Sequence, residues 1–162
     1  MRCVQRNAPR PHSGVSLGTM STAIYATPDD AEQAFYDAFS RSDLEAMMSV
    51  WAEDEETICI HPGGSRFNGI GAIRESWKQL FETGMKFHVR ASNVIKTHSA
   101  LIAVHSLLQH LGVEGDDTIA PPLITTNVYT RGPRGWQLLI HHTSPAPDTN
   151  GLMMQEAPRT VH

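Results

Sequence analysis

The stretch from Pro122 to Ser144, PLITTNVYTRGPRGWQLLIHHTS, contains two runs of strand-forming residues separated by a short turn. Both runs are rich in β-branched and aromatic side chains, which are favoured in strands. The turn, Gly132-Pro133-Arg134-Gly135, combines residues that readily reverse the chain direction. The stretch therefore predicts a β-hairpin formed by residues 122–131 and 136–144.

Three further strands are predicted before this hairpin. Residues 87–92 alternate between apolar and polar side chains, and Ala100–Leu111 is a long apolar run with polar interruptions. A short apolar run, Thr57–Ile60, predicts one more strand earlier in the chain. We expect the last four strands to be joined as antiparallel hairpins.

Three helices are predicted in the first half of the chain. Thr27 and Pro28 mark the start of the first helix, because threonine is a good N-cap and proline suits the first helical position. A capping box from Ser42 to Glu45 predicts the start of the second helix. The third helix is predicted over residues 70–83, where a glycine follows as a natural stop.

Helices that precede a group of strands are typical of the α+β class. We expect a cone-shaped α+β barrel, in which the N-terminal helices pack on the concave face of a curved antiparallel sheet. A strongly curved sheet cannot contact its helices everywhere. The layout therefore predicts a pocket between the two layers, apolar at its base and with a few polar groups pointing inward.

Composition narrows the partners of the protein. The 162 residues suit one domain, and the net charge of −4 comes with no basic stripe, so we expect no nucleic-acid partner. No apolar run approaches the ~20 residues that span a bilayer, so we expect no membrane partner and a cytoplasmic location. Two cysteines are too few for a disulfide framework or a metal cluster.

Metal binding is not expected at the adjacent histidines His141 and His142. Neighbouring residues of a strand project to opposite faces, so these two imidazoles cannot bind one ion. No cysteine or carboxylate lies at a suitable spacing nearby, and we expect neither a metal nor a cofactor.

The two ends of the chain differ in composition from the middle. Residues 1–27 carry three arginines as their only charged side chains. This composition is typical of a disordered extension, of a start assigned too early, or of an organelle transit segment. Residues 147–162 are expected to form a flexible tail, which leaves residues 28–146 as the folded domain.

The helix pair, the HPGG corner at residues 61–64, the helix start GIGAIR at residues 69–74 and the closing strand GWQLLIHHTSP resemble the nuclear-transport-factor-2-like superfamily. More narrowly, they resemble its SnoaL-like and ketosteroid-isomerase-related branch. The closing strand is also similar to the association domain of calcium/calmodulin-dependent kinases. The resemblance covers about residues 28–146 and implies a fold that serves enzymes, binding proteins and oligomerisation modules alike.

The comparison with ketosteroid isomerase implies a changed active site. Its carboxylate base falls on His61, its oxyanion-hole tyrosine on Phe35, and its protonated aspartic acid on Thr126 or Asn127. The tyrosine and the protonated aspartic acid that form the oxyanion hole of ketosteroid isomerase are therefore both replaced by other residue types. His61 remains a candidate base, because an unperturbed imidazole titrates near neutral pH.

His61 is also held by its position in the chain. The following Pro62 biases it toward an extended backbone at the end of a strand. Two interpretations remain open: the imidazole closes the corner by bonding a neighbouring carbonyl, or it is presented to the pocket as a functional group.

The resemblance to the association domain implies which strand residues face the pocket, since its pocket arginines fall on Ser106, Asn127 and Thr143. Their replacement by neutral side chains predicts a neutral ligand. Strand alternation extends the prediction. The residues expected to face inward are Val104, Ser106, Leu108, Thr125, Asn127, Tyr129, Leu139, His141 and Thr143. Those expected to face outward include Trp136, Leu138, Ile140 and His142.

From these considerations we expect His61 and His141 as catalytic candidates. The expected ligand-binding residues are Phe35, Trp51, Ser106, Asn127, Tyr129 and Thr143, although core packing is an open alternative for Trp51. The outward face of the sheet is apolar, at Ile124, Val128, Leu138 and Ile140, which predicts a homodimer packed sheet to sheet.

Three functions remain open on the sequence alone. The first is a protein that binds a neutral, partly apolar small molecule in its pocket. The second is an isomerase, dehydratase or cyclase that uses His61 as its base. The third is an association module with a vestigial pocket.

Overall fold

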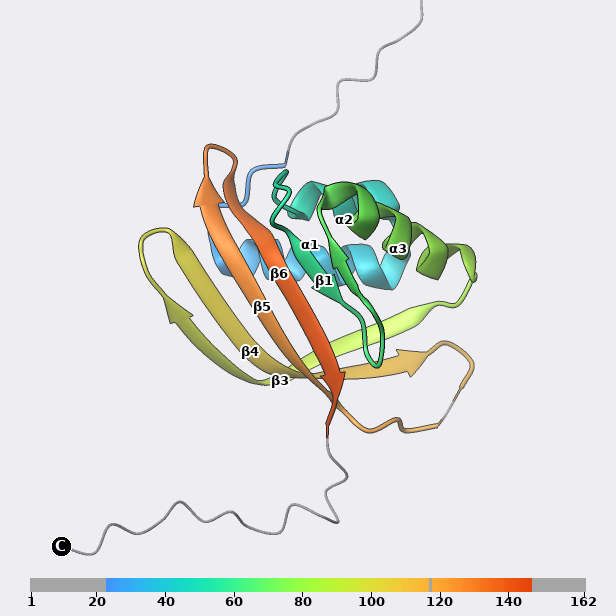
Figure 1. Cartoon of the computed structure of the whole chain (residues 1–162). Helices are drawn as coiled ribbons and strands as arrows, with labels where there is room; N and C mark the ends of the chain where they lie inside the picture. The colour runs from blue at the N-terminus through green and yellow to red at the C-terminus, as the bar shows by residue number, and fades with distance from the viewer. Residues whose placement is uncertain (1–22, 117, 147–162) are drawn as a thin grey trace, which may run out of the picture.

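The computed structural model describes residues 23–116 and 118–146 (Figure 1). The predictions for residues 1–22 and 147–162 lie outside these ranges. The helices are α1 (Pro28–Arg41), α2 (Leu44–Val50) and α3 (Ile70–Glu82). The strands are β1 (Ile58–Ile60), β2 (Arg66–Asn68), β3 (Phe87–His98), β4 (Ile102–Val113), β5 (Leu123–Gly132) and β6 (Gly135–Pro145).

The start of α1 is the predicted one. The Thr27 side chain accepts a hydrogen bond from the Asp30 backbone, and the Asp30 carboxylate accepts one from the Thr27 backbone. The predicted capping box at Ser42 is wrong by one residue. Ser42 adopts a left-handed backbone (φ 53°) and ends α1, so the neighbouring Asp43 caps α2 instead.

The strands form one six-stranded sheet in the order β2-β1-β6-β5-β4-β3. All neighbours are antiparallel except β1, which runs parallel to β6. The hairpin of β5 and β6 is the one predicted around the turn at residues 132–135. Strand β2 was not predicted, because its single apolar residue, Phe67, stands between Arg66 and Asn68 and forms no apolar run like that of β1.

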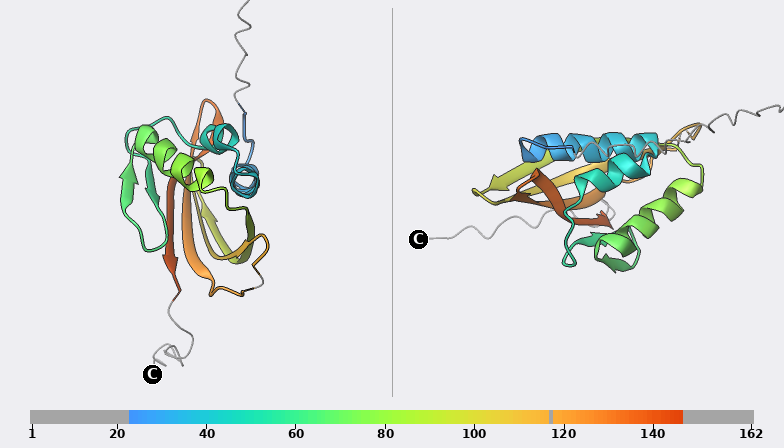
Figure 2. Two further views of the ribbon diagram at one scale, coloured as in Figure 1. Left: turned by 90° about the vertical axis from the view of Figure 1, so that its right-hand side faces the viewer. Right: turned by 90° about the horizontal axis from the view of Figure 1, so that it is seen from above.

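The helices lie on one side of the curved sheet, and the sheet does not close on itself (Figure 2). The predicted α+β class, with N-terminal helices on a curved sheet, is therefore confirmed. The core between the layers includes Ala31, Phe35, Ala38 and Phe39 of α1, and both Trp51 and Trp77 are almost fully buried. None of the described helices is long and apolar enough to span a bilayer.

The predicted inward face is confirmed on β5, where Thr125, Asn127 and Tyr129 are all fully buried. On β6, His141 and Thr143 are buried and His142 is exposed, as predicted. The first half of β6 differs. Val128 pairs with Ile140 but Tyr129 pairs with Leu138, so Leu139 is an extra residue. This bulge reverses the alternation, and both Leu138 and Trp136 are buried instead of facing outward.

The prediction for β4 is wrong by one residue throughout. Its buried side chains are Ala103, His105, Leu107 and Gln109, whereas Val104, Ser106 and Leu108 point to the other face. Register confirms this placement, because His105 pairs with the inward-facing Asn127. The interior accepts the two polar residues since both are hydrogen-bonded there.

Candidate functional site

A cavity of about 330 Å³ lies between the helices and the sheet. Its wall comes from α1, α3, β3, β4, β6 and the turn that follows β1. Six lining residues are apolar, namely Phe39, Pro62, Trp77, Leu80, Phe87 and Leu111. Four are polar, namely His61, Gln109, His141 and Thr143. The volume falls in the usual range for small-molecule sites, and the lining contains no carboxylate, lysine or arginine from the described residues.

His61 reaches this cavity from the end of β1. Its backbone carbonyl accepts from Gly64 and closes the corner, which leaves the imidazole free to point elsewhere. The Nε2 atom lies 3.1 Å from Ser76 Oγ on α3. Because the Ser76 hydroxyl donates its proton to the Ile73 carbonyl, Nε2 of His61 must be the donor to Ser76. The proton of a neutral His61 therefore lies on Nε2.

The environment of His61 favours its neutral form. Its ring packs edge to face on Trp77, with the ring centres 4.9 Å apart. Burial lowers the pKa of the His61 imidazole below its ordinary value. Neutral His61 carries a lone pair on Nδ1, which is the atom that can accept a proton.

His141 faces the same cavity from β6 and is almost completely buried. Its Nδ1 lies 2.7 Å from Asn127 Oδ1, and its Nε2 lies 2.9 Å from Thr143 Oγ1. Burial is the main cause that lowers the pKa of His141 to about 3, and the nearby His61 and His142 lower it further. The imidazole is therefore neutral at physiological pH.

A buried polar cluster lies behind His141 and is centred on Glu32 of α1. The Glu32 Oε2 atom accepts from His105 Nδ1 at 2.9 Å, from the Tyr129 hydroxyl at 3.1 Å and from Asn127 Nδ2 at 3.3 Å. Asn127 Nδ2 also lies 3.2 Å from the Tyr36 hydroxyl. Burial raises the pKa of both tyrosines, which keeps their hydroxyl groups protonated. These contacts satisfy a carboxylate that would otherwise be costly to bury.

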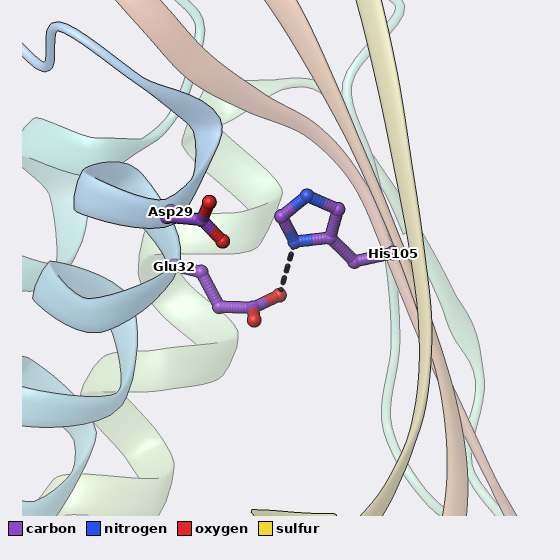
Figure 3. Close-up of side chains that lie close together, drawn as sticks. All are labelled: Asp29, Glu32 and His105. Atoms are coloured by element: carbon purple, nitrogen blue, oxygen red, sulfur yellow. Dashed lines mark hydrogen bonds and ion pairs between the residues drawn. The ribbon is translucent and has the colours of Figure 1, made fainter. Parts of the chain in front are cut away.

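Asp29, Glu32 and His105 come together at the start of α1 (Figure 3). One potential ligand atom from each lies within 4.8 Å of the others, which is close enough for a metal ion. The groups are already matched to other partners, however. Lys96 forms an ion pair with Asp29, and His105 donates to Glu32. The ion pair of Lys96 with Asp29 and the hydrogen bond of His105 to Glu32 account for the way these side chains lie.

A family model described as a SnoaL-like domain matches residues 29–148. This chain belongs to the SnoaL-like family. The chain is also 30% identical over 104 residues to the F-box protein SKIP8 of Arabidopsis thaliana. That match covers 62% of this chain and only 42% of the longer F-box protein.

The solved structures that resemble this SnoaL-like chain include two with sequence identities of 35% and 25%. A Thiobacillus denitrificans protein, provisionally described as a calcium/calmodulin-dependent protein kinase type II association domain, is 35% identical with a TM-score of 0.69. It is matched over 98% of its length and 76% of this chain. A Streptomyces avermitilis protein, provisionally described as a dehydratase of the NTF2-like family, is 25% identical with a TM-score of 0.67. All of that protein and 75% of this chain are matched. The predicted nuclear-transport-factor-2-like resemblance is confirmed.

The SnoaL-like fold brings some of the predicted site residues together and separates others. His61, His141 and Thr143 line the cavity, whereas Asn127 and Phe35 lie directly behind His141. Trp51 and Tyr129 are fully buried and do not line it. Ser106 is on the opposite face of the sheet, because the inward positions of β4 are one residue out of step with the prediction.

Three functional candidates were missed by sequence reasoning. Gln109 lines the cavity, and Glu32 and His105 form the polar cluster behind it. Alternation on β4 groups His105 and Gln109 on one face with Ala103 and Leu107, but it does not indicate that this face points inward. Glu32 carried no signal either, because an acidic residue in the first turns of a helix is normally exposed.

Proposed function

We propose that the cavity binds a neutral, partly apolar small molecule. The observation that carries the proposal is the composition of the wall, in which aromatic and aliphatic side chains surround a few uncharged polar groups. A charged ligand would lose its hydration without gaining an opposite charge, which is costly. An apolar molecule with one or two hydrogen-bonding groups could pack against the apolar wall and form hydrogen bonds with the polar lining residues.

A cavity-filling substitution tests this proposal. Leu111→Trp should fill the cavity, whereas Leu101→Trp places the same side chain on an exposed site of the turn between β3 and β4, at the other end of β4. Native mass spectrometry should detect small molecules retained from the expression host by the wild type and by Leu101→Trp, but not by Leu111→Trp. Equal retention by all three folded proteins, or none by any together with no binding from a fragment collection, would refute it.

A second candidate function is proton transfer by His61, as in an isomerase, dehydratase or cyclase. It is favoured by the two neutral imidazoles, His61 and His141, which share one cavity wall. An imidazole with a free Nδ1 lone pair can act as a general base. The similarity to a protein provisionally described as a dehydratase points the same way.

Exchange of carbon-bound hydrogen tests the second function separately from binding. A retained ligand incubated with the protein in D₂O should take up deuterium at one carbon, and His61→Gln should abolish this uptake. Unchanged uptake in His61→Gln would remove His61 from the role of base. Binding without any uptake would leave a binding protein.

The outer face of the sheet supports a homodimer. Val104, Val128 and Ile140 are neighbours across three strands, and Ile124, which is 40% exposed, lies further along β5 on the same face. Leu138 was predicted to belong to this face but is buried by the bulge in β6. The helices leave the outer face uncovered, so a second copy would bury it (Figure 2).

The molecular mass of the protein in solution tests the proposed homodimer directly. We expect a dimer at micromolar concentration and a monomer for Ile140→Arg, with Gln79→Arg on the exposed side of α3, away from the sheet's outer face, as the control. A wild-type monomer would contradict the proposal. If the dimer forms but no ligand is ever retained, the third alternative, an association module, becomes the better description.

A further inference from the structure

A chain of four buried side chains connects the first helix to the cavity. It runs from Glu32 on α1 through Asn127 on β5 to His141 and Thr143 on β6, and the last two line the cavity. We propose that Glu32 sets the direction of the hydrogen bonds along this chain, so that Thr143 presents an acceptor and selects a ligand carrying a hydroxyl or N–H donor. The inference rests on the proposed function, because it concerns the ligand of the same cavity.

The direction is fixed at the Glu32 end. Glu32 Oε2 is an acceptor, and it already receives hydrogen bonds from two other buried donors. If the Asn127 amide were turned over, its Oδ1 would face this oxygen with no proton between them. The amide nitrogen therefore faces Glu32, at 3.3 Å, and the amide oxygen faces His141.

The protons on the next two side chains follow from this orientation. Because Asn127 Oδ1 can only accept, His141 must carry its proton on Nδ1. Its Nε2 then has a lone pair, and the Thr143 hydroxyl, 2.9 Å away, donates to it. The single proton of Thr143 is thereby used, and its oxygen has only lone pairs left for a ligand.

The neighbouring contacts agree with this assignment. The Thr125 hydroxyl donates to Gln109 Oε1 at 3.2 Å and also lies 3.3 Å from the Thr143 oxygen. The Thr143 proton goes to His141 and the Thr125 proton goes to Gln109, so neither is left for the contact between the two threonines. That contact, at 3.3 Å, is longer than the other two. Among the described residues, nothing accepts from Gln109 Nε2, and Gln109 lines the cavity.

The polar end of the cavity therefore offers an acceptor at Thr143 and a donor at Gln109. A ligand with a hydroxyl or a primary carboxamide satisfies both, since each of these groups donates and accepts. An ether or a tertiary amide of the same shape can only accept. It would leave the Thr143 oxygen without a donor, and buried polar groups without partners weaken binding.

The first test determines the tautomer of His141 in the ligand-free protein. The ¹⁵N chemical shifts of the imidazole distinguish a proton on Nδ1 from one on Nε2. We expect Nδ1 in the wild type and in Glu32→Gln, whose amide oxygen still accepts from Asn127. In Glu32→Leu, which removes the acceptor, we expect a mixture of tautomers, with Asp29→Asn as a control one turn away.

Two results of this test would overturn the proposal. One is a wild-type His141 protonated on Nε2, and the other is a folded Glu32→Leu with an unchanged tautomer. If Glu32→Leu does not fold, the wild-type tautomer and the ligand comparison decide the matter together.

The second test compares matched pairs of probes by NMR titration. The pairs are benzyl alcohol with benzyl methyl ether, and benzamide with N,N-dimethylbenzamide. We expect the donor-bearing member of each pair to bind the wild type at least about ten-fold more tightly. Thr143→Val should remove the difference, and Thr143→Ser should restore it.

The outcomes separate the inference from the function on which it rests. Equal binding within each pair overturns the proposed selection by Thr143 while leaving the cavity as a binding site. If none of the four probes binds, the result counts against the proposed function, and the tautomer of His141 still decides the direction of the chain.

Discussion

The Nδ1 atom of His141 lies 2.7 Å from the Oδ1 atom of Asn127, and these residues are directly paired across β5 and β6. Both side chains are almost completely buried. Their contact joins the polar cluster around Glu32 to the cavity, so it links a residue on the first helix with a group that a ligand would meet.

Removing this link should cost stability. Asn127→Ala leaves His141 Nδ1 without its acceptor and removes one of the donors to Glu32. We expect a loss of about 2–3 kcal/mol in the free energy of unfolding. Urea denaturation measures this loss. Ser106→Ala is the control on the outer face and should change stability by less than about 0.5 kcal/mol. Equal losses in the two variants would contradict the assignment of the inner face.

Acid should destabilise the protein through His141. The pKa of His141 is lowered from 6.5 to about 3, so between these values the unfolded chain binds a proton that the folded chain does not. Stability therefore falls as the pH decreases through this window, by up to about 1.4 kcal/mol per unit from this residue. The lowered pKa of His61 acts in the same direction.

The contribution of His141 is isolated by substitution. Urea denaturation at pH 7, 6, 5 and 4 should show a shallower pH dependence for His141→Gln than for the wild type. The carboxylates titrate in both proteins and cancel in the comparison. Parallel curves would mean that His141 is protonated in the folded state.

Two glycines of the β5–β6 turn should respond differently to alanine. Gly135 has a φ of 77°, and an added Cβ would collide with the Tyr25 carbonyl, which accepts from the Trp136 backbone. Gly132 has nothing within 4 Å of the corresponding position. We expect Gly135→Ala to cost at least about 2 kcal/mol and Gly132→Ala less than about 1 kcal/mol, as judged by urea denaturation. Similar costs would show that the turn adapts freely.

The N-cap of α1 should be worth a measurable amount. Thr27→Ala removes the hydrogen bond to the Asp30 backbone, and we expect a loss of about 1 kcal/mol in unfolding free energy. Thr27→Ser retains the hydroxyl and should lose much less. A loss in Thr27→Ser as large as in Thr27→Ala would assign the effect to the lost methyl group instead of the cap.

Much of the fold follows from local patterns in the sequence. The capping residues of α1 and the turn residues between β5 and β6 act over a few positions, and they correctly predict these elements. On β5, alternation groups Thr125, Asn127 and Tyr129 on one face, and the resemblance to the association domain correctly predicts that this face points inward. A bulge at Leu139 is different, since it depends on how two strands pair and leaves no local pattern.

The candidate site was only partly predictable for the same reason. His61 could be found because the following proline restrains the end of a strand. On β4, both faces contain a mixture of apolar and polar side chains, so hydrophobicity alone could not choose between Ser106 and His105. The hydrogen bond to Glu32 stabilises His105 on the inward face. Because Glu32 lies 73 positions from His105 in sequence, no local pattern indicates this contact.

The parallel pairing of β1 with β6 has a consequence for biosynthesis. Cys59 and Ile60, which precede His61, are aligned with His141 and His142, so the ribosome must add some eighty further residues before His61 can be anchored. Until then His141 and Thr143, which complete the wall of the binding chamber, are absent as well. Any small molecule that this protein captures must therefore arrive after translation of the last strand, and premature termination before that strand would yield a product without a ligand site.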